Sequence, residues 1–383
     1  MTTMAIDNKD KKVLNVPHLR FPEFSGEWKK HSLGEIGETI IGLTYKPADV
    51  VDNNGIIVFR SSNIKNGMID YSDLVRVNKH IKDKIITKEN DILVCARNGS
   101  QRLIGKNAII KQEDANNTFG AFMMVYRAND NPFILPLLST KKYFSQVGEN
   151  LGARINQITT SDFNGFEFYF PENHAERTKI AELFRLLDER IATQNKIIED
   201  LKKLKSAISE RLFNAIKGDV VVLEDIGDVV KGKQINGEFL SESGKYYVMN
   251  GGIEPSGFYN DYNVEANTIS ISEGGNSCGY VQFNACPFWS GGHCYTIQNT
   301  TDNVKTEYLY QFLKSKESEI MKLRIGSGLP NIQKKDLAKF KITIPNISEQ
   351  KVISAFLSSF ERKADVEMNF VNLLLEEKQY LLR

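Results

Sequence analysis

Two long stretches of the chain repeat apolar residues at alternating spacings of four and three. The seam positions of the first stretch are Ile180, Phe184, Leu187, Ile191, Gln194, Ile198, Leu201, Lys205, Ile208 and Leu212. Those of the second are Ile353, Leu357, Phe360, Ala364, Glu367, Val371, Leu374, Lys378 and Leu381. Such spacings place side chains on one face of a helix, and a sustained heptad is typical of a coiled coil. The pattern predicts two long helices that pair antiparallel.

The polar breaks in the two seams occur at matching places. Gln194 matches Glu367 and Lys205 matches Lys378, both at an offset of 173. One antiparallel register brings Gln194 opposite Lys378 and Lys205 opposite Glu367. Because polar seam residues fix register at a cost in stability, these pairs are predicted to set the register. The alternative interpretation is that they are solvated edges of amphipathic helices.

The segments outside the helices alternate short β-type runs with Asn-Gly and Gly-Gly turn signals. The sequence of residues 33–42 is similar to that of 223–232, and the sequence of 158–171 is similar to that of 332–345. These similarities indicate that one strand-rich unit is duplicated in the chain. Each copy also contains an expected helix, at 133–146 or at 307–322, before a Gly-rich turn. The repeat places a globular part before each long helix.

We therefore expect an α+β fold with two mixed domains, related by an approximate twofold axis and joined by the coiled coil. The expected divisions are an N-terminal segment 1–27, a first domain 28–171, a central helix 172–217, a second domain 218–345 and a C-terminal helix 346–383.

Composition narrows the class of protein. The 383 residues are 41% apolar and 25% charged, which is typical of globular domains. No long apolar run or secretory signal occurs, so we expect a cytoplasmic protein.

The four cysteines, Cys95, Cys278, Cys286 and Cys294, are expected to be free thiols. Seven residues separate Cys278 from Cys286, whereas paired zinc ligands usually have two to four between them, so no metal site is predicted.

Charge is nearly balanced, with a formal net charge of +1. Residues 28–170 carry 18 basic and 15 acidic residues, whereas 220–344 carry 12 and 14. Neither domain is strongly basic. Any contact with nucleic acid must therefore depend on clustered positive residues.

Polar loops after the β-type runs carry side chains suited to reading DNA. Arg can bond to guanine with two hydrogen bonds, and Asn or Gln can do the same with adenine. The candidates in the first domain are Arg60, Ser62, Asn63, Lys65, Arg97, Asn98, Ser100, Gln101, Arg102, Arg154 and Asn156. The candidates in the second domain are Asn250, Asn276, Ser277 and Asn331. The alternative is that these residues only form turns that the fold requires.

Three segments resemble the specificity subunits of type I restriction-modification enzymes: 16–28, 171–180 and 345–353. The resemblance extends from about Val16 to the end of the chain. It implies two target-recognition domains and two helical regions that set their spacing and dock two methyltransferase subunits. It also implies that S-adenosylmethionine, ATP and Mg are bound by partner subunits. A separate motor-nuclease subunit would then hydrolyse ATP and cleave DNA. No cofactor is then expected in this chain.

The sequence contains neither an Asn-Pro-Pro-Tyr type tetrapeptide nor a Walker-type phosphate loop. We therefore expect a non-catalytic subunit. Because the two domains are related by an approximate twofold axis but differ in sequence, we expect it to read a bipartite, asymmetric DNA target, with one domain for each half-site. The alternative is a coiled-coil adaptor whose globular ends bind protein instead of DNA, which the near-neutral charge favours.

Overall fold

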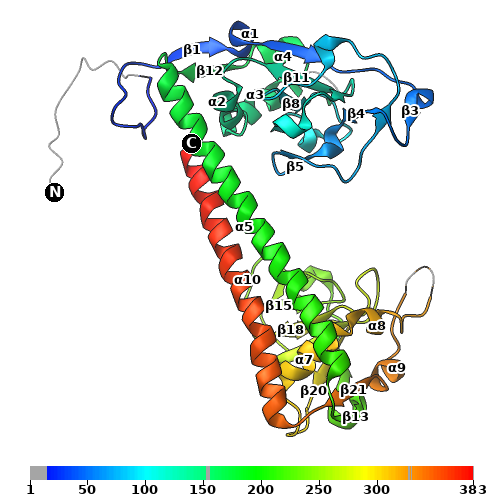
Figure 1. Ribbon diagram of the computed structural model, residues 1–383. Coiled ribbons are helices and arrows are strands. Elements are labelled where there is room, and N and C mark those ends of the chain that lie inside the picture. Colours follow the sequence, from blue (N-terminus) through cyan, green and yellow to red (C-terminus); the bar gives the residue numbers. More distant parts are fainter. Residues whose placement is uncertain (1–14, 152–155, 327, 329, 383) are drawn as a thin grey trace, which may run out of the picture. The chain divides into compact units, whose positions relative to one another are not determined.

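The protein is described by a computed structural model that covers residues 15–151, 156–326, 328 and 330–382 (Figure 1). The chain divides into two compact units. Unit 1 comprises Met1–Thr193 and Val371–Arg383, and unit 2 comprises Gln194–Phe370. The long helices α5 (His174–Ala215) and α10 (Ile347–Leu381) each contribute one part to each unit.

Unit 1 is built on two four-stranded sheets. The antiparallel sheet has the order β2 (Glu38–Ile41), β11 (Met123–Arg127), β8 (Ile92–Cys95), β9 (Asn107–Ile109). The other has the order β10 (Thr118–Phe119), β4 (Ile56–Phe59), β7 (Arg76–Val77), β3 (Val50–Val51), with β10 parallel to β4. Two further pairs are β1 (Lys29–Ser32) with β12 (Glu167–Phe170) and β5 (Ile64–Lys65) with β6 (Met68–Ile69). The helices are α1 (Leu33–Ile36), α2 (Asn131–Leu137), α3 (Lys141–Leu151) and α4 (Thr160–Asn164).

Unit 2 has a closely similar plan. Its antiparallel sheet has the order β14 (Asp228–Lys231), β20 (Cys294–Gln298), β17 (Thr268–Ser272), β18 (Val281–Asn284). Its second sheet has the order β16 (Phe258–Tyr259), β15 (Tyr246–Met249), β19 (Trp289–Ser290), with β19 parallel to β15. A further pair is β13 (Asp219–Val222) with β21 (Lys341–Ile344). The helices are α6 (Leu223–Ile226), α7 (Thr306–Ser315), α8 (Glu317–Met321) and α9 (Lys334–Ala338). The expected fold class is confirmed: both units mix helix and sheet, and two long helices are present.

All four residues of the central strand β8 and all five of the central strand β17 are buried. A strand that is covered on both faces has no solvent-facing positions, and β8 is accordingly apolar throughout, with the sequence Ile-Leu-Val-Cys. The β17 strand instead alternates Ile with Thr and Ser, and its buried hydroxyls make hydrogen bonds, for example from Ser272 to the Gly251 carbonyl at 2.6 Å. In unit 1 the covering layer includes α3, whose Tyr143 and Val147 are buried in the core.

The repeated glycines Gly42 and Gly232 allow a close backbone approach in each unit. A Cβ atom on Gly42 would lie 2.2 Å from the carbonyl oxygen of Gly120, and a Cβ on Gly232 would lie 2.2 Å from that of Gly291. No side chain fits at such distances. The same packing constraint therefore accounts for the same glycine in both copies of the repeat.

The single helix expected over 133–146 is divided into two helices, because α2 ends at Leu137 and α3 begins at Lys141, directly after Thr140. The Thr140 hydroxyl accepts a hydrogen bond from the Tyr143 N–H at 3.2 Å, as a capping residue does. The helix expected over 307–322 is likewise divided into α7 and α8. Periodicity alone did not reveal either break.

The two long helices run antiparallel, as predicted, but the predicted register is wrong. In unit 2, Gln194 donates a hydrogen bond to Glu367, and the Lys205 ammonium lies 2.7 Å from the Glu361 carboxylate. Lys205 was expected opposite Glu367, so its contact is displaced by six residues, close to one heptad. Gln194 is only 4% exposed, which rules out the solvated-edge interpretation for this residue.

Unit 1 shows the same displacement. Lys378 contacts Asp188 at 2.5 Å and not the expected Gln194, again six residues away. A slip of one heptad keeps apolar positions facing one another, so the seam pattern does not distinguish the two registers. In unit 2 the register is held by packing against the globular part, because Phe213, which lies outside the seam, and the seam residue Leu357 are both buried in its core.

Within the described part of the chain, no helix is both long enough and apolar enough to cross a membrane.

Candidate nucleic-acid interface

Three of the predicted loop segments of unit 1 lie together in the structure. The Asn98 side-chain amide donates to the Ser61 hydroxyl at 2.9 Å, which joins the loop after β8 to the loop after β4. The Asn156 side-chain amide donates to the Gly99 carbonyl at 3.0 Å and brings in the third segment. The loops thus form one polar surface at the ends of β4 and β8. Arg154, from the same segment, lies outside the described residues.

Asn63 fits the alternative interpretation of these residues, in which the side chain forms a turn that the fold requires. It is fully buried; its carbonyl oxygen accepts from the Arg60 N–H at 2.9 Å, and its amide donates to the carbonyls of Asp70 and Asp73. Because these bonds occupy both ends of the amide, Asn63 holds the loop in shape. We therefore remove it from the residues proposed to touch DNA.

The cations of these loops fall into two groups. Arg60 lies 2.8 Å from Asp73, and Lys65 lies 2.9 Å from Asp70, so their charges are partly balanced. Hydrogen bonding from the Ser72 hydroxyl and then from Lys65 lowers the pKa of Asp70 to about 2, which keeps this carboxylate ionised.

Arg97 and Arg102 form the second group. Both are exposed, and neither has an acidic partner among the residues that the structure describes. Ser62, Ser100 and Gln101 are exposed beside them. Unit 1 therefore presents two unbalanced guanidinium groups on a polar surface.

Phe122 belongs to the same surface, although the sequence analysis did not single it out. Its side chain is 59% exposed, and the Arg97 guanidinium carbon lies 5.1 Å from the centre of its ring. The Phe122 carbonyl accepts hydrogen bonds from the N–H groups of Ala96 and Arg97, both at 3.0 Å. A lone Phe in a sequence usually indicates core, so only the preceding Gly120 turn could have drawn attention to it.

The corresponding loops of unit 2 also meet. The Ser277 hydroxyl donates to the Gly251 carbonyl at 2.8 Å, and the Asn250 side-chain oxygen accepts from the His293 N–H at 3.1 Å. Asn331 forms an antiparallel bridge with Gly274. The predicted residues Asn250, Ser277 and Asn331 are thus gathered at one place, with the exposed Asn276 next to them.

A buried carboxylate lies in the middle of this second surface. Glu273 is 7% exposed, and its Oε1 accepts from Lys231 at 2.6 Å and from the Tyr295 hydroxyl at 3.1 Å. Burial, and then the neighbouring Glu273 charge, raise the pKa of Tyr295. The other oxygen, Oε2, finds no hydrogen-bond donor in the described structure; His293 Nδ1 is 3.8 Å away. The sequence contained this segment but gave no signal that the carboxylate is buried.

Cys95, Cys278 and Cys294 are buried free thiols, and Cys286 is exposed. Burial raises the pKa of Cys95 and that of Cys294 to about 11, which keeps both as unreactive thiols. Among the residues with defined positions, no three His, Cys, Asp or Glu side chains could hold a metal ion.

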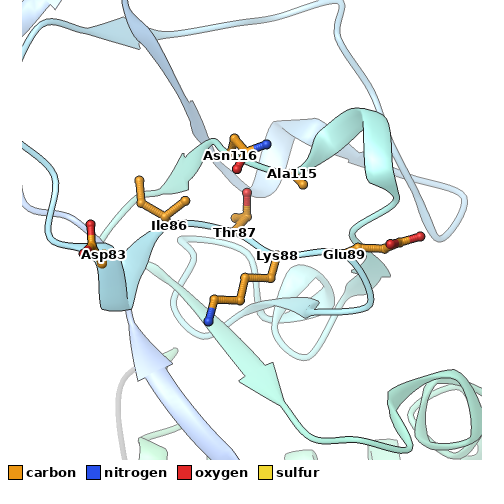
Figure 2. Close-up of a pocket in the computed structure, with 7 residues that line it drawn as sticks. All are labelled: Asp83, Ile86, Thr87, Lys88, Glu89, Ala115 and Asn116. Atoms are coloured by element: carbon orange, nitrogen blue, oxygen red, sulfur yellow. The ribbon is translucent and has the colours of Figure 1, made fainter.

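A cavity of about 380 Å³ lies elsewhere in unit 1 (Figure 2). It is lined by Asp83, Ile86, Thr87, Lys88, Glu89, Ala115 and Asn116. The Thr87 hydroxyl is engaged in hydrogen bonds within the protein, because it donates to the Asp114 carbonyl at 3.2 Å and accepts from the Asn117 N–H at 3.1 Å. None of the predicted DNA-reading residues lines this cavity.

The model of the type I restriction modification DNA specificity domain matches the chain twice, over residues 25–203 and 217–374. A putative type I specificity subunit from Mycoplasma pneumoniae is 34% identical over 161 residues, which is 42% of each protein. The match thus spans about two fifths of the first curated relatives. The MjaVIII specificity subunit of Methanocaldococcus jannaschii is 23% identical over 91% of this chain and 89% of its own length.

Solved structures share the fold. The S subunit of a type I restriction-modification system from M. genitalium superposes with a TM-score of 0.63 at 21% identity, covering 93% of this chain and 95% of that one. A chain from a study of complex assembly in the type I R-M system gives a TM-score of 0.53 at 16% identity, covering 96% and 98%.

Proposed function

Because the chain belongs to the type I restriction-modification DNA specificity family, we propose that it is the subunit that recognises the DNA sequence in such a complex. One observation carries the proposal: the same loop arrangement occurs twice, with different polar side chains in each copy. Two surfaces of the same plan but different chemistry suit a target with two different half-sites.

Unit 1 would read one half-site and unit 2 the other, through the domains at 28–171 and 218–345. The proposed contacts of unit 1 are Arg60, Ser62, Lys65, Arg97, Asn98, Ser100, Gln101, Arg102, Arg154 and Asn156. Those of unit 2 are Asn250, Asn276, Ser277 and Asn331. The exposed Arg97 and Arg102 suit guanine or phosphate. The coiled coil would set the spacer between the half-sites.

The chain would act without catalysing a reaction, within a cytoplasmic complex. Methyltransferase subunits would supply S-adenosylmethionine, and motor-nuclease subunits would supply ATP and Mg. The outer face of α10 supports docking of the methyltransferase subunits, because Val352, Val366, Leu373 and Tyr380 are exposed at multiples of seven residues. An apolar stripe at this spacing can pack against a partner helix.

The other interpretation, a coiled-coil adaptor without DNA binding, gains no support. Both matched regions belong to the DNA specificity domain family, and together they include both globular parts. Near-neutral charge, which favoured the adaptor, is compatible with DNA recognition when a partner supplies phosphate contacts.

The test is to co-express the chain with its methyltransferase subunit in a host that lacks other adenine methylation, and to map methylated adenines across the genome. We expect one bipartite motif with two different half-sites. The absence of any motif, with the complex assembled, would contradict the proposal.

A further inference from the structure

Backbone contacts identify equivalent positions in the two units. The Gly120 N–H donates to the Phe59 carbonyl at 2.9 Å, and the Gly291 N–H donates to the Met249 carbonyl at 2.8 Å. Both glycines directly follow a strand that pairs parallel with its neighbour. The turns that begin at Gly120 and Gly291 are therefore the same element of the repeated fold.

Two residues after these glycines, each unit places a side chain at the polar surface. The Phe122 carbonyl accepts from the Ala96 N–H at 3.0 Å, and the His293 carbonyl accepts from the Glu273 N–H at 2.9 Å. Ala96 and Glu273 each directly follow a central strand, β8 or β17. Phe122 and His293 are thus held by the same hydrogen bond in the two copies.

Both side chains are exposed although their backbones are fixed. Phe122 is 59% exposed, and the His293 side chain is 66% exposed. The backbone hydrogen bonds thus present each ring at the polar surface, where a bound molecule can contact it. Each is beside an ionic group of its own unit: Arg97 lies against the Phe122 ring, and Glu273 lies next to His293.

We propose that Phe122 and His293 are equivalent specificity-determining residues, each contacting a base edge in the major groove of its own half-site; this rests on the proposed function. The Phe122 ring has no hydrogen-bonding group and suits the C5-methyl of thymine, with Arg97 available to a neighbouring guanine. The His293 imidazole is a hydrogen-bonding group and suits the guanine acceptors O6 and N7. The exchange of Phe for His at one position then helps to make the half-sites different.

The experiment uses the full chain co-expressed with its methyltransferase subunit, with genome-wide mapping of methylated adenine as the readout. Phe122→Ala should relax one position of one half-site by about tenfold, and His293→Ala should relax one position of the other half-site by a similar factor. Phe144→Ala and Tyr262→Ala remove exposed rings of units 1 and 2 that are not among the proposed contacts. These controls should leave the motif unchanged.

A second arm changes the DNA instead of the protein. Thymines of the first half-site are replaced one at a time by deoxyuridine, which lacks only the methyl group. Binding by the native complex should weaken at one thymine, and binding by the Phe122→Ala complex should be insensitive at that same thymine. Phe122→Leu and His293→Gln are the variants to use if a truncation prevents assembly.

The inference is overturned if the native complex yields a bipartite motif but both variants keep every position, or if either variant relaxes both half-sites. A native complex that yields no motif would instead contradict the proposed function itself. The two failures are therefore distinguishable.

Discussion

Units 1 and 2 share a framework and differ in the side chains that they present. Gly42 and Gly232 make the same close approach, and the turns that begin at Gly120 and Gly291 are held by the same backbone hydrogen bonds. On this framework Phe122 in unit 1 is replaced by His293 in unit 2, and Ala96 by Glu273. The comparison teaches that the duplicated fold fixes its backbone with glycines and hydrogen bonds, which leaves the loop side chains free to differ.

The charges of the two surfaces differ as well. Arg97 and Arg102 of unit 1 are exposed and have no acidic partner among the described residues. The Lys231 ammonium of unit 2 lies 2.6 Å from the buried Glu273 carboxylate. Unit 1 therefore has two exposed cations that no described carboxylate balances, whereas Lys231 of unit 2 is paired with a carboxylate of its own unit.

The largest expected effect comes from breaking the shared framework. Gly42→Ala and Gly232→Ala should each lower the free energy of unfolding of the affected unit by about 3 kcal/mol, because the new Cβ collides with a backbone carbonyl. The two tryptophans, Trp28 in unit 1 and Trp289 in unit 2, report on the units separately in urea titrations of single-tryptophan variants.

The controls are Gly99→Ala and Gly237→Ala, where a Cβ would have nothing within 4 Å. They should leave both transitions within a few tenths of a kcal/mol of the parent. Equal losses from the close-approach variants and their controls would contradict the shared constraint.

A smaller effect is expected from removing Arg97, one of the two cations of unit 1 that no described carboxylate balances. Arg97→Ala should weaken binding of the assembled complex to its target duplex by about 2 kcal/mol, because it removes a contact to guanine or phosphate. Lys84→Ala, which alters an exposed cation paired with Glu38, is the matched control and should have little effect. Affinities from fluorescence anisotropy at several salt concentrations test this; an Arg97 variant no weaker than the Lys84 variant would remove Arg97 from the interface.

Disrupting the ion pair between Lys205 of α5 and Glu361 of α10 is expected to have a smaller effect, on the free energy of unfolding. Lys205→Glu should lower the free energy of unfolding by about 1 kcal/mol, because it places a carboxylate against Glu361. Adding Glu361→Lys should restore most of the loss. Lys203→Glu is the control, because Lys203 is exposed and pairs only within its own helix. If Glu367→Lys and not Glu361→Lys restores stability, the pairing of Lys205 with Glu361 is contradicted.

The smallest expected effect is the chemical labelling of one cysteine, which leaves the stability of the protein unchanged. Cys286 is the exposed thiol, and burial raises the pKa of Cys95 and of Cys294 to about 11. Because thiolate is the reactive form, iodoacetamide at pH 8 should label the native chain once, in unit 2. Peptide mass spectrometry locates the label; modification of Cys95 in the native chain would contradict the buried core of unit 1.

The sequence was sufficient to predict the repeat, the buried strands and the two antiparallel helices, because these depend on periodic apolar patterns. It was not sufficient to predict the register, since a slip of one heptad preserves the seam and the anchoring by Phe213 and Leu357 is tertiary. Asn63 was misread because a polar residue in a loop resembles a base contact until its buried hydrogen bonds are seen. Phe122 was missed for the opposite reason, because an aromatic residue suggests core until its exposure is known.

The central claim is that each unit reads its own half-site, and photocross-linking tests it most directly. Thymines in either half of the target duplex are replaced by 5-iodouracil, and the cross-linked peptides are identified after irradiation of the assembled complex. We predict that one half cross-links only to the loops of unit 1 within residues 60–156 and the other only to the loops of unit 2 within 250–331. Cross-links from one half-site to the loops of both units would contradict the account.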